Sequence, residues 1–346
     1  RERANTRPQP PSIALPLPNE YRMSSPCQLA LLLLGMACRL PGASAFALAR
    51  LPAPSRVVAI GDIHGDLNAL INCLEFSDLY SKAKDCWTGG DAVLVQTGDV
   101  LDRGTDEPAI LELLQKLKLQ AAEAGGKVIT LLGNHEYLNC VADMTFVEDL
   151  DCFGEDRVEA FRPGSPLARQ LADWPVVAVV GDTAFCHAGL TLKHAKRVDA
   201  INRRAAKWLR GEDGPVTRKV RLESNRGSFY THNDLPKSLP PNELREYTPS
   251  PLFTRWFGKL IDYSLYYPPR EELCRVLRVL NVSRMVVGHD IEPCISSDCE
   301  GLIFKIDIGM SSAIYGRAGE TLEIVGNDVF ILKEGERIPA KQRARC

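Results

Sequence analysis

Residues 57–66 read VVAIGDIHGD, residues 93–104 read VLVQTGDVLDRG and residues 127–136 read KVITLLGNHE. Each stretch contains a short apolar run of the kind that forms a buried strand. From these runs we expect strands over Val57–Ile60, Ala92–Gln96 and Lys127–Leu132. Between the last two, Glu107–Ala124 carries apolar residues at helical spacing and predicts a helix. This strand–helix–strand alternation predicts an α/β fold with parallel strands.

The second half of the chain continues the alternation. Pro175–Val180 and Thr183–Cys186 flank a Gly-Asp pair, which is a strong hairpin signal. We interpret Ile201–Leu209 as a helix that packs on the core. Further strand signals are Arg284–Val287, Leu302–Ile308 and Thr321–Leu332. Residues 212–251 are polar and contain Pro, and an irregular stretch of this length is usually a functional or mobile insertion.

Potential metal ligands follow five of these strands. The motifs are GDIHGD at 61–66, GDVLDRG at 98–104, GNHE at 133–136, TAFCHAG at 183–189 and VVGH at 286–289. Any one of them alone is most often a plain loop or strand end. Together they hold four of the six histidines of the chain. Because ligands collect at the carboxyl ends of strands in α/β sheets, five such ends in order predict a metal site.

The ligand types fit a two-metal site for phosphoryl transfer. Ions of borderline character accept imidazole nitrogen together with carboxylate oxygen. Two such ions can share a carboxylate and a bridging hydroxide, and they clamp the attacking and leaving oxygens. We assign one ion to Asp62, His64 and His289, and the other to Asn134, His187 and the bridging Asp99.

Other residues of the motifs are assigned to the substrate. Arg103 and a later arginine would grip the phosphate in the bidentate manner of guanidinium, beside Asn134. His135 is not needed as a ligand and is the candidate general acid to the leaving oxygen. Asp102 is the candidate carboxylate that holds the tautomer of His135.

The five motifs in this order resemble the signature of the calcineurin-like metallophosphoesterases, and the complete GDVLDRG with GNHE is similar to their phosphoprotein phosphatase branch. Longer stretches are similar to the Shewanella-like protein phosphatases, from about Val57 to Ile324. These are LVQTGDVLDRGTDEPAILELL, AFRPGSPLARQLA, VGDTAFCHAGL, INRRAAKWLRG and IDIGMSSA. The family usually has Thr-Pro after the last motif histidine, whereas this chain has Asp290 and Ile291.

The resemblance implies a metallophosphatase sandwich of two mixed β-sheets flanked by helices, with a dinuclear site at the carboxyl edge of the strands. It also implies two divalent or trivalent ions (Mn, Fe or Zn) and hydrolysis of phosphoproteins by a metal-bridging hydroxide. Related folds hydrolyse small molecules such as dinucleoside polyphosphates, which is the alternative activity. A non-catalytic phosphoprotein-binding module would be expected to lack His135 or Asp102, and both are present.

Two arginines compete for the second phosphate contact. Arg226 lies in SNRGSF, which is similar to a segment of the eukaryotic phosphoprotein phosphatases. Arg255 lies in SPLFTRWFG, which is similar to a segment of bacterial-type members. We favour Arg255 because the apolar residues around it would anchor the segment on the core, and bidentate binding needs a rigid guanidinium.

The N-terminal segment is interpreted as targeting sequence. Residues 1–22 predict a disordered or untranslated leader, and residues 23–55 a presequence. The apolar run Leu29–Cys38 has the length of a signal-peptide core, and Ala43–Ala45 supply an A-x-A cleavage site. We therefore expect secretory entry with Phe46 as the first mature residue. The stretch ASAFA resembles plastid presequences of secondary-plastid algae, and a cytoplasmic location is the alternative.

The catalytic domain is expected over residues 56–333, with a tail over 334–346. The formal net charge of −2 gives no support for nucleic-acid binding, and we expect no stable membrane association once the presequence is removed. The chain has eleven cysteines, of which Cys294 and Cys299 could bridge a loop in an oxidising compartment. His194 and His232 lie outside the motifs and are expected at the surface.

Overall fold

The structure is a computed structural model that describes residues 50–213, 239–246, 249–257 and 270–340. Its strands are β1 (Arg50–Leu51), β2 (Val57–Ile60), β3 (Tyr80–Ser81), β4 (Cys86–Trp87), β5 (Val93–Gln96), β6 (Lys127–Thr130), β7 (Val177–Val180), β8 (Thr183–Cys186), β9 (Arg284–Val287), β10 (Ser296–Asp298), β11 (Ile303–Lys305), β12 (Thr321–Val325), β13 (Asp328–Lys333) and β14 (Glu336–Pro339).

The helices of the described residues alternate with these strands. They are α2 (Leu67–Phe76), α3 (Glu107–Glu123), α4 (Asn134–Cys140), α5 (Arg157–Phe161), α6 (Pro166–Leu171), α7 (Leu192–Ala195), α8 (Val198–Leu209) and α9 (Arg270–Leu280), with short 3₁₀ turns at Asn242–Leu244 and Cys299–Gly301.

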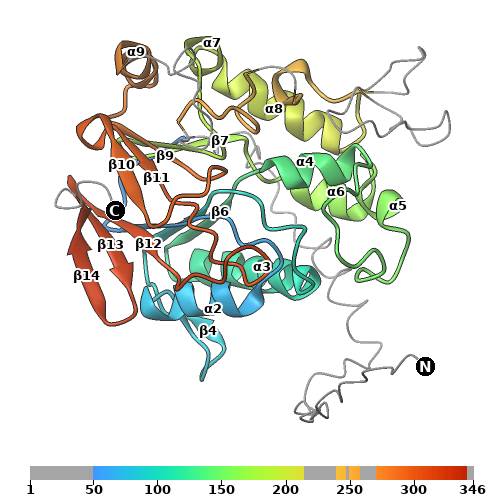
Figure 1. Cartoon of the computed structure of the whole chain (residues 1–346), viewed down its shortest axis with the longest axis horizontal. Helices are drawn as coiled ribbons and strands as arrows, with labels where there is room; N and C mark the ends of the chain where they lie inside the picture. The colour runs from blue at the N-terminus through green and yellow to red at the C-terminus, as the bar shows by residue number, and fades with distance from the viewer. Residues whose placement is uncertain (1–49, 214–238, 247–248, 258–269, 341–346) are drawn as a thin grey trace, which may run out of the picture. The chain divides into compact units, whose positions relative to one another are not determined.

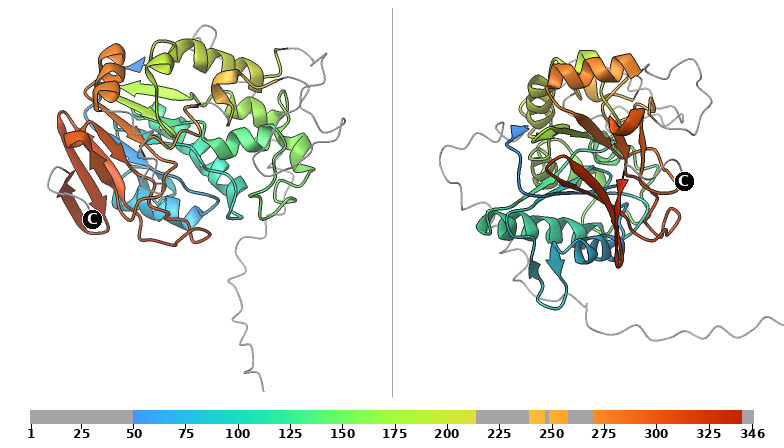
Figure 2. Two further views of the ribbon diagram at one scale, coloured as in Figure 1. Left: turned by 45° about the horizontal axis from the view of Figure 1, so that its top comes forward. Right: turned by 90° about the vertical axis from the view of Figure 1, so that its left-hand side faces the viewer.

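Two six-stranded mixed sheets form the core of the domain. One has the order β14-β13-β12-β2-β5-β6, in which β2, β5 and β6 are parallel. The other has the order β1-β7-β8-β9-β11-β10, in which β8 and β9 are parallel. Figure 1 shows the sheets between α2 and α3 on one side and α7, α8 and α9 on the other, and Figure 2 shows the same layers in two further views. The predicted sandwich of two mixed sheets flanked by helices is confirmed.

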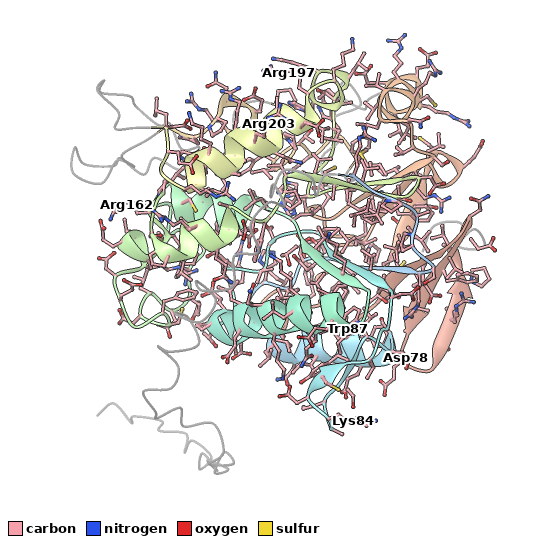
Figure 3. All side chains as sticks on the ribbon, turned by 180° about the vertical axis from the view of Figure 1, so that it is seen from behind. Asp78, Lys84, Trp87, Arg162, Arg197 and Arg203 are labelled. Carbon is pink, nitrogen blue, oxygen red and sulfur yellow. The ribbon has the colours of Figure 1, made fainter. Side chains whose placement is uncertain are left out.

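Burial explains why the apolar runs become central strands. Val58, Ile60 and Leu94 have no exposed surface, and each such side chain contributes about 1.5–3 kcal/mol by leaving water. The helices present only one face to this core. In α8 the buried side chains include Ile201 and Trp208, whereas Arg203 projects from the outer surface (Figure 3).

The predicted elements agree closely with the observed ones. Val57–Ile60 and Arg284–Val287 are strands over the residues expected, and the predicted helix at Glu107–Ala124 ends one residue earlier. The segment Thr321–Leu332 is a hairpin with Gly326 at φ 57, a left-handed conformation that glycine adopts without strain. The predicted strand Leu302–Ile308 is shorter, because the chain leaves the sheet after Lys305.

Both ends of the domain extend beyond the predicted boundaries of 56 and 333. Strand β1 pairs in parallel with β7 and so lies inside the segment expected to be presequence. Strand β14 pairs with β13 and so lies inside the segment expected to be a tail. Neither was predicted, because β1 has only two residues and β14, with the sequence ERIP, has no apolar run. Most of the predicted insertion at 212–251 lies outside the described residues, as do the predicted leader and signal-peptide core.

Two predictions about single residues are wrong. Cys299 is a free thiol, so it forms no bridge with Cys294. His194 is buried and belongs to the cap of α7, whereas His232 lies outside the described residues. Among the described residues, no helix combines the length and the apolar character that crossing a bilayer requires.

Candidate metal centre

Five strand ends from both sheets bring the predicted ligands together. Asp62 and His64 follow β2, Asp99 follows β5, and Asn134 begins α4 after β6. From the second sheet, His187 follows β8 and His289 follows β9. All six side chains are buried, with His289 the most exposed at 8%. The site therefore lies at the carboxyl ends of strands from the two sheets, as the motif order predicts.

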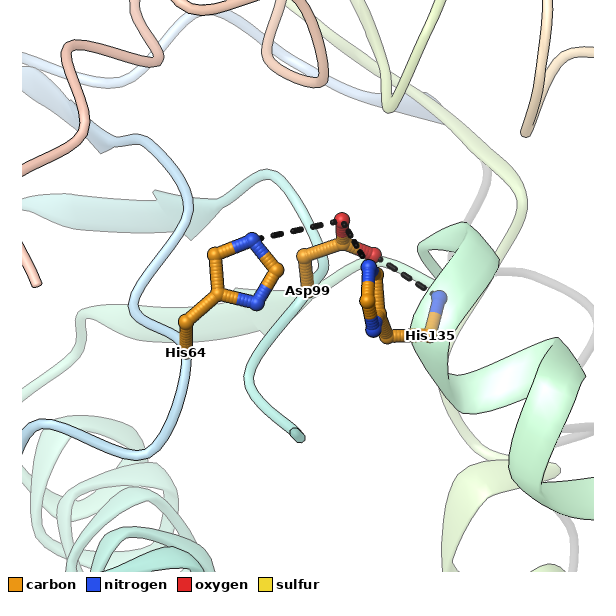
Figure 4. Close-up of side chains that lie close together, drawn as sticks. All are labelled: His64, Asp99 and His135. Carbon is orange, nitrogen blue, oxygen red and sulfur yellow. Dashed lines mark hydrogen bonds and ion pairs between the residues drawn. The ribbon is translucent and has the colours of Figure 1, made fainter. Parts of the chain in front are cut away.

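Asp99 is the centre of this arrangement. Its Oδ2 lies 3.8 Å from His64 Nε2, 3.8 Å from His135 Nε2 and 3.3 Å from His187 Nε2. Figure 4 shows His64 and His135 on either side of the carboxylate. Its Oδ1 accepts a hydrogen bond from the backbone N–H of His135 at 3.0 Å. One carboxylate thus faces three imidazoles, a position that suits a ligand shared by two ions.

Two groups of three residues each have ligand atoms within 4.8 Å of one another: His64, Asp99 and His135, and Asp99, His187 and His289. Asn134 belongs with the second group, because its Oδ1 lies 2.8 Å from His187 Nε2. His289 also belongs there, because its Nδ1 lies 3.2 Å from the same nitrogen. The sequence analysis placed His289 with Asp62 and His64, whereas these contacts bring its ring to His187 and Asn134.

Asp62 lies outside both groups. Its carboxylate accepts the backbone N–H of His289 at 3.1 and 3.3 Å, and so joins the β2 loop to the β9 loop. Burial raises the pKa of Asp62 well above its ordinary value, and the charges of Asp307 and Asp99 raise it further. Buried carboxylates that lie close together repel one another, and a cation bound between them would stabilise their charged forms.

The histidines present the correct atoms to a metal. The other ring nitrogen of His187 is 2.9 Å from the carbonyl of Thr97, and that of His64 is 3.2 Å from the carbonyl of Leu101. Such contacts fix the tautomer of a metal-binding histidine. His289 Nε2 is buried without a hydrogen-bond partner. Burial, followed by the charge of His135, lowers the pKa of His64 to about 4, so its imidazole is neutral as a ligand requires.

The loops that carry these residues are held in strained conformations. Five non-glycine residues of the site have positive φ: His64, Asp99, Asp102, Arg103 and His289. Each such residue costs of order 1–3 kcal/mol, and clusters of them are typical of functional sites. A Cβ at Gly133 or Gly288 would collide with the carboxylates of Asp99 or Asp62, so the close approach of the backbone requires glycine.

Glu136 fixes the relative position of the second and third loops, a role that was not predicted. Its carboxylate accepts the backbone N–H groups of Gly133, Asp99, Val100 and Leu101 at 2.7–3.1 Å. Burial, and then the charge of Asp99, raises the pKa of Glu136 to about 7. The motif GNHE contains this glutamate, but nothing local in the sequence shows that its partners lie on the preceding loop.

His135 and Asp102 form the predicted pair. His135 Nδ1 lies 2.7 Å from Asp102 Oδ2, which leaves Nε2 directed toward the metal groups. Burial works to lower the pKa of His135, but Asp99 and Asp102 outweigh it and raise the pKa above its ordinary value. A protonated imidazole held in this way is suited to donate a proton.

Asp102 also belongs to a buried hydrogen-bond network that the sequence analysis did not predict. Arg157 Nη2 donates to Asp102 at 3.1 Å, and both terminal nitrogens of Arg157 donate to Glu107 at 2.6–2.7 Å. Arg157 Nε donates to Asn139 at 2.7 Å, and Asn139 in turn donates to Asp102 at 2.8 Å. The carboxylate that orients His135 is thus itself oriented by two side chains from α4 and α5.

The two predicted phosphate-binding arginines contact different side chains. Arg103 is exposed, and its guanidinium stacks on Phe146 with the carbon Cζ 4.2 Å from the ring centroid. Arg255 is also exposed, and its Nη1 donates to Asp290 beside His289. Leu252 is fully buried and anchors the segment as expected. Arg226 lies outside the described residues.

The arrangement defines the class of protein. Residues 55–293 match the model of the calcineurin-like phosphoesterases, and the chain belongs to this family, which uses divalent metal ions. Shewanella-like protein phosphatase 2 of Arabidopsis thaliana is 29% identical over 80% of this chain and 76% of its own length. Shewanella-like protein phosphatase 1 of Plasmodium berghei is 30% identical over 74% of this chain and 67% of its own. Within the family, the chain is a Shewanella-like protein phosphatase.

Two further proteins are similar to this chain. An uncharacterised protein of Schizosaccharomyces pombe is 30% identical over 83% of this chain and 82% of its own length. The crystal structure of a cold-active protein tyrosine phosphatase from a psychrophilic Shewanella species has a TM-score of 0.66, with 21% identity over 86% of this chain and 85% of that one. At this identity the likeness shows the fold alone.

Proposed function

We propose that the chain is a metal-dependent phosphoprotein phosphatase that hydrolyses phosphomonoesters. The observation that carries the proposal is the position of Asp99 Oδ2, 3.3–3.8 Å from three imidazole nitrogens. Mn, Fe and Zn all suit this mixture of nitrogen and oxygen ligands. When bound, two such ions supply a water of lowered pKa and stabilise the charge of phosphoryl transfer.

We assign the ligands according to the observed grouping. His64 and Asp99 would hold the first ion, with Asp62 on the same loop after β2 as His64. Asn134, His187 and His289 would hold the second ion together with Asp99. The family of the chain and the buried, mutually repelling carboxylates both support this assignment.

The remaining residues act on the substrate. Arg103 and Arg255 bind the phosphate oxygens, with Asn134 beside them, and guanidinium groups suit this geometry. His135 donates its Nε2 proton to the leaving alkoxide oxygen, while Asp102 keeps the proton on Nδ1. Arg157 and Asn139 hold Asp102 in place.

The activity is tested by offering Mn-loaded protein phosphoserine, phosphothreonine and phosphotyrosine peptides beside diadenosine tetraphosphate. We expect release of phosphate from peptides, with an Asp99→Asn variant as the inactive control. Cleavage of the dinucleotide alone would support the small-molecule alternative. Binding of phosphopeptide without turnover would support a binding module.

We also propose that the chain enters the secretory route and begins at Phe46 after cleavage. The proposal is supported by the apolar run and the A-x-A site in the sequence. A start at Phe46 keeps β1, whereas removal of a plastid transit segment reaching Arg56 would delete a strand that pairs with β7. N-terminal sequencing of protein from its native cells identifies the first residue of the mature chain. A start at Met23, or a cytosolic pool alone, would contradict it.

A further inference from the structure

One aromatic ring contacts two of the side chains assigned to the substrate. The Arg103 guanidinium lies over the ring of Phe146, 4.2 Å from its centroid. The imidazole of His135 lies on the same ring, with centroids 5.0 Å apart and planes at 53°. Phe146 is half-buried and comes from the loop after α4, which none of the sequence motifs includes.

The backbone fixes Phe146 at this position. Its carbonyl accepts the backbone N–H of Arg103 at 3.0 Å, so the two residues are joined by main chain as well as by stacking. Before it, the Asp143 carboxylate accepts both the N–H and the hydroxyl of Thr145, at 3.1 and 2.5 Å. After it, Arg157 donates to the carbonyl of Asp149 at 3.4 Å. The loop is therefore tied on both sides of Phe146.

Stacking suits an arginine that must bind phosphate. The ring occupies the face of the guanidinium, whereas phosphate oxygens bind a guanidinium through the N–H groups in its plane. The same ring limits the rotation of the His135 imidazole, whose Nδ1 is already fixed by Asp102. An error of about 1 Å in the relative placement of such groups can cost on the order of a hundredfold in rate.

We propose that Phe146 is a positioning residue that sets the Arg103 guanidinium and the His135 imidazole relative to each other. The proposal rests on the proposed phosphatase function and adds a residue that acts through two others. Phe146 thereby determines the separation between the point where phosphate is held and the point where the leaving oxygen is protonated.

The test replaces Phe146 by Leu, Tyr and Trp, and measures kcat and KM on a phosphoserine peptide. Leu keeps much of the volume but has no π face, and we expect kcat/KM to fall about tenfold. Tyr and Trp keep the face and should stay within about threefold of the parent. The matched control is Phe330→Leu on β13, where Arg337 stacks on Phe330 away from the site, and activity should not change.

Two further measurements separate positioning from packing. In an Arg103→Ala background, Phe146→Leu should cost less than in the parent, because one of its two partners is already absent. Binding of inorganic phosphate, measured by calorimetry, should weaken about tenfold in Phe146→Leu with unchanged metal content. Equal losses in both backgrounds, or equal activity of Leu, Tyr and Trp variants, would overturn the proposal.

The outcomes distinguish this inference from the function on which it rests. If the parent protein hydrolyses no phosphomonoester, the proposed function is wrong, whereas weakened phosphate binding by Phe146→Leu still supports the placement of Arg103. If the parent is active and Phe146→Leu behaves like the parent in both assays, only the role of Phe146 is wrong.

Discussion

His135 shows how much a single side chain depends on distant ones. Asp102 holds its Nδ1, and Arg157, which is 55 residues from Asp102, donates to that carboxylate at 3.1 Å. Breaking such a buried pair by removing one partner is strongly destabilising, since a charge is left uncompensated. The protonating group is therefore built from α4, α5 and the β5 loop together.

Replacing His135 by Asn removes the proton donor. We expect hydrolysis of phosphoserine, whose alkoxide is a poor leaving group, to slow by about a hundredfold or more. An activated aryl phosphate needs less protonation and should lose less. Steady-state rates on both substrates, with metal content measured beside them, check the prediction. Equal losses on the two would instead indicate that His135 acts in placing the metals.

Arg255 reaches the site through its ion pair with Asp290, beside His289. Replacing Arg255 by Ala should raise KM and lower kcat for phosphopeptides, because one phosphate contact is lost. Metal content should not change. Arg226→Ala is the matched variant and should have little effect. If Arg226→Ala, and not Arg255→Ala, loses phosphatase activity, Arg226 supplies the second phosphate contact.

The ligands could be predicted because each directly follows an apolar strand run, a local pattern. Residues whose function depends on tertiary partners could not be. Phe146, Arg157 and Asn139 belong to no motif, and only the folded chain shows that they meet Arg103 or Asp102. The contact of His289 with His187 was not predicted for the same reason, because the order of motifs does not show which loops face each other.

At the scale of elements, helix α7 depends on a reciprocal cap. Thr191 Oγ1 accepts the backbone N–H of His194 at 3.4 Å, and His194 Nδ1 lies 3.4 Å from the backbone N of Thr191. Burial, with the charge of Lys193, lowers the pKa of His194 to about 4, while Glu243 opposes the shift. The imidazole must therefore stay neutral for the cap to persist.

This cap predicts a pH dependence of stability. In the unfolded chain His194 binds a proton near pH 6.5, whereas the folded chain resists it down to about 4. Its contribution is complete above pH 6.5 and falls between pH 6.5 and 4, by about 1–3 kcal/mol. His194→Gln keeps a neutral capping group, so its urea-unfolding free energy should depend less on pH in this window. An unchanged pH slope would contradict the prediction.

The elements themselves were predictable where apolar periodicity is long. Helix α3 has apolar residues at helical spacing and the central strands have continuous buried runs, and their bounds agree with the predicted ones within two residues. Short elements such as β1 and the β3–β4 hairpin owe their existence to neighbours in space. The strand predicted from Leu302 ends at Lys305, whose ammonium is held by Glu292 at 2.6 Å, a contact that no local pattern shows.

At the scale of the whole molecule, the metal groups join the two sheets. His64, Asp99 and Asn134 come from one sheet, and His187 and His289 from the other. A ligand that binds only the folded state raises the free energy of unfolding by RT ln(1 + [L]/Kd). Ions at this position should therefore affect the stability of the whole sandwich as well as its activity.

Removal of metal tests this prediction. After stripping with a chelator, phosphatase activity should be lost and the midpoint of thermal unfolding should fall, and added Mn should restore both. Heating curves and phosphopeptide assays on the same samples check it, with His64→Ala as a variant that should respond less to Mn. Activity that persists in stripped protein would show that the mechanism proposed for this site is wrong.

The spread of the site along the chain has a consequence during synthesis. The bond between His289 and Asp62 joins residues 227 positions apart. At about 5–20 residues per second, His289 leaves the ribosome roughly 10–45 seconds after Asp62. A nascent chain therefore exposes His64 and Asp99 well before the second group can be completed. We therefore expect any ion captured early to be held by an incomplete set of ligands, and to stay exchangeable until nearly the whole domain has emerged.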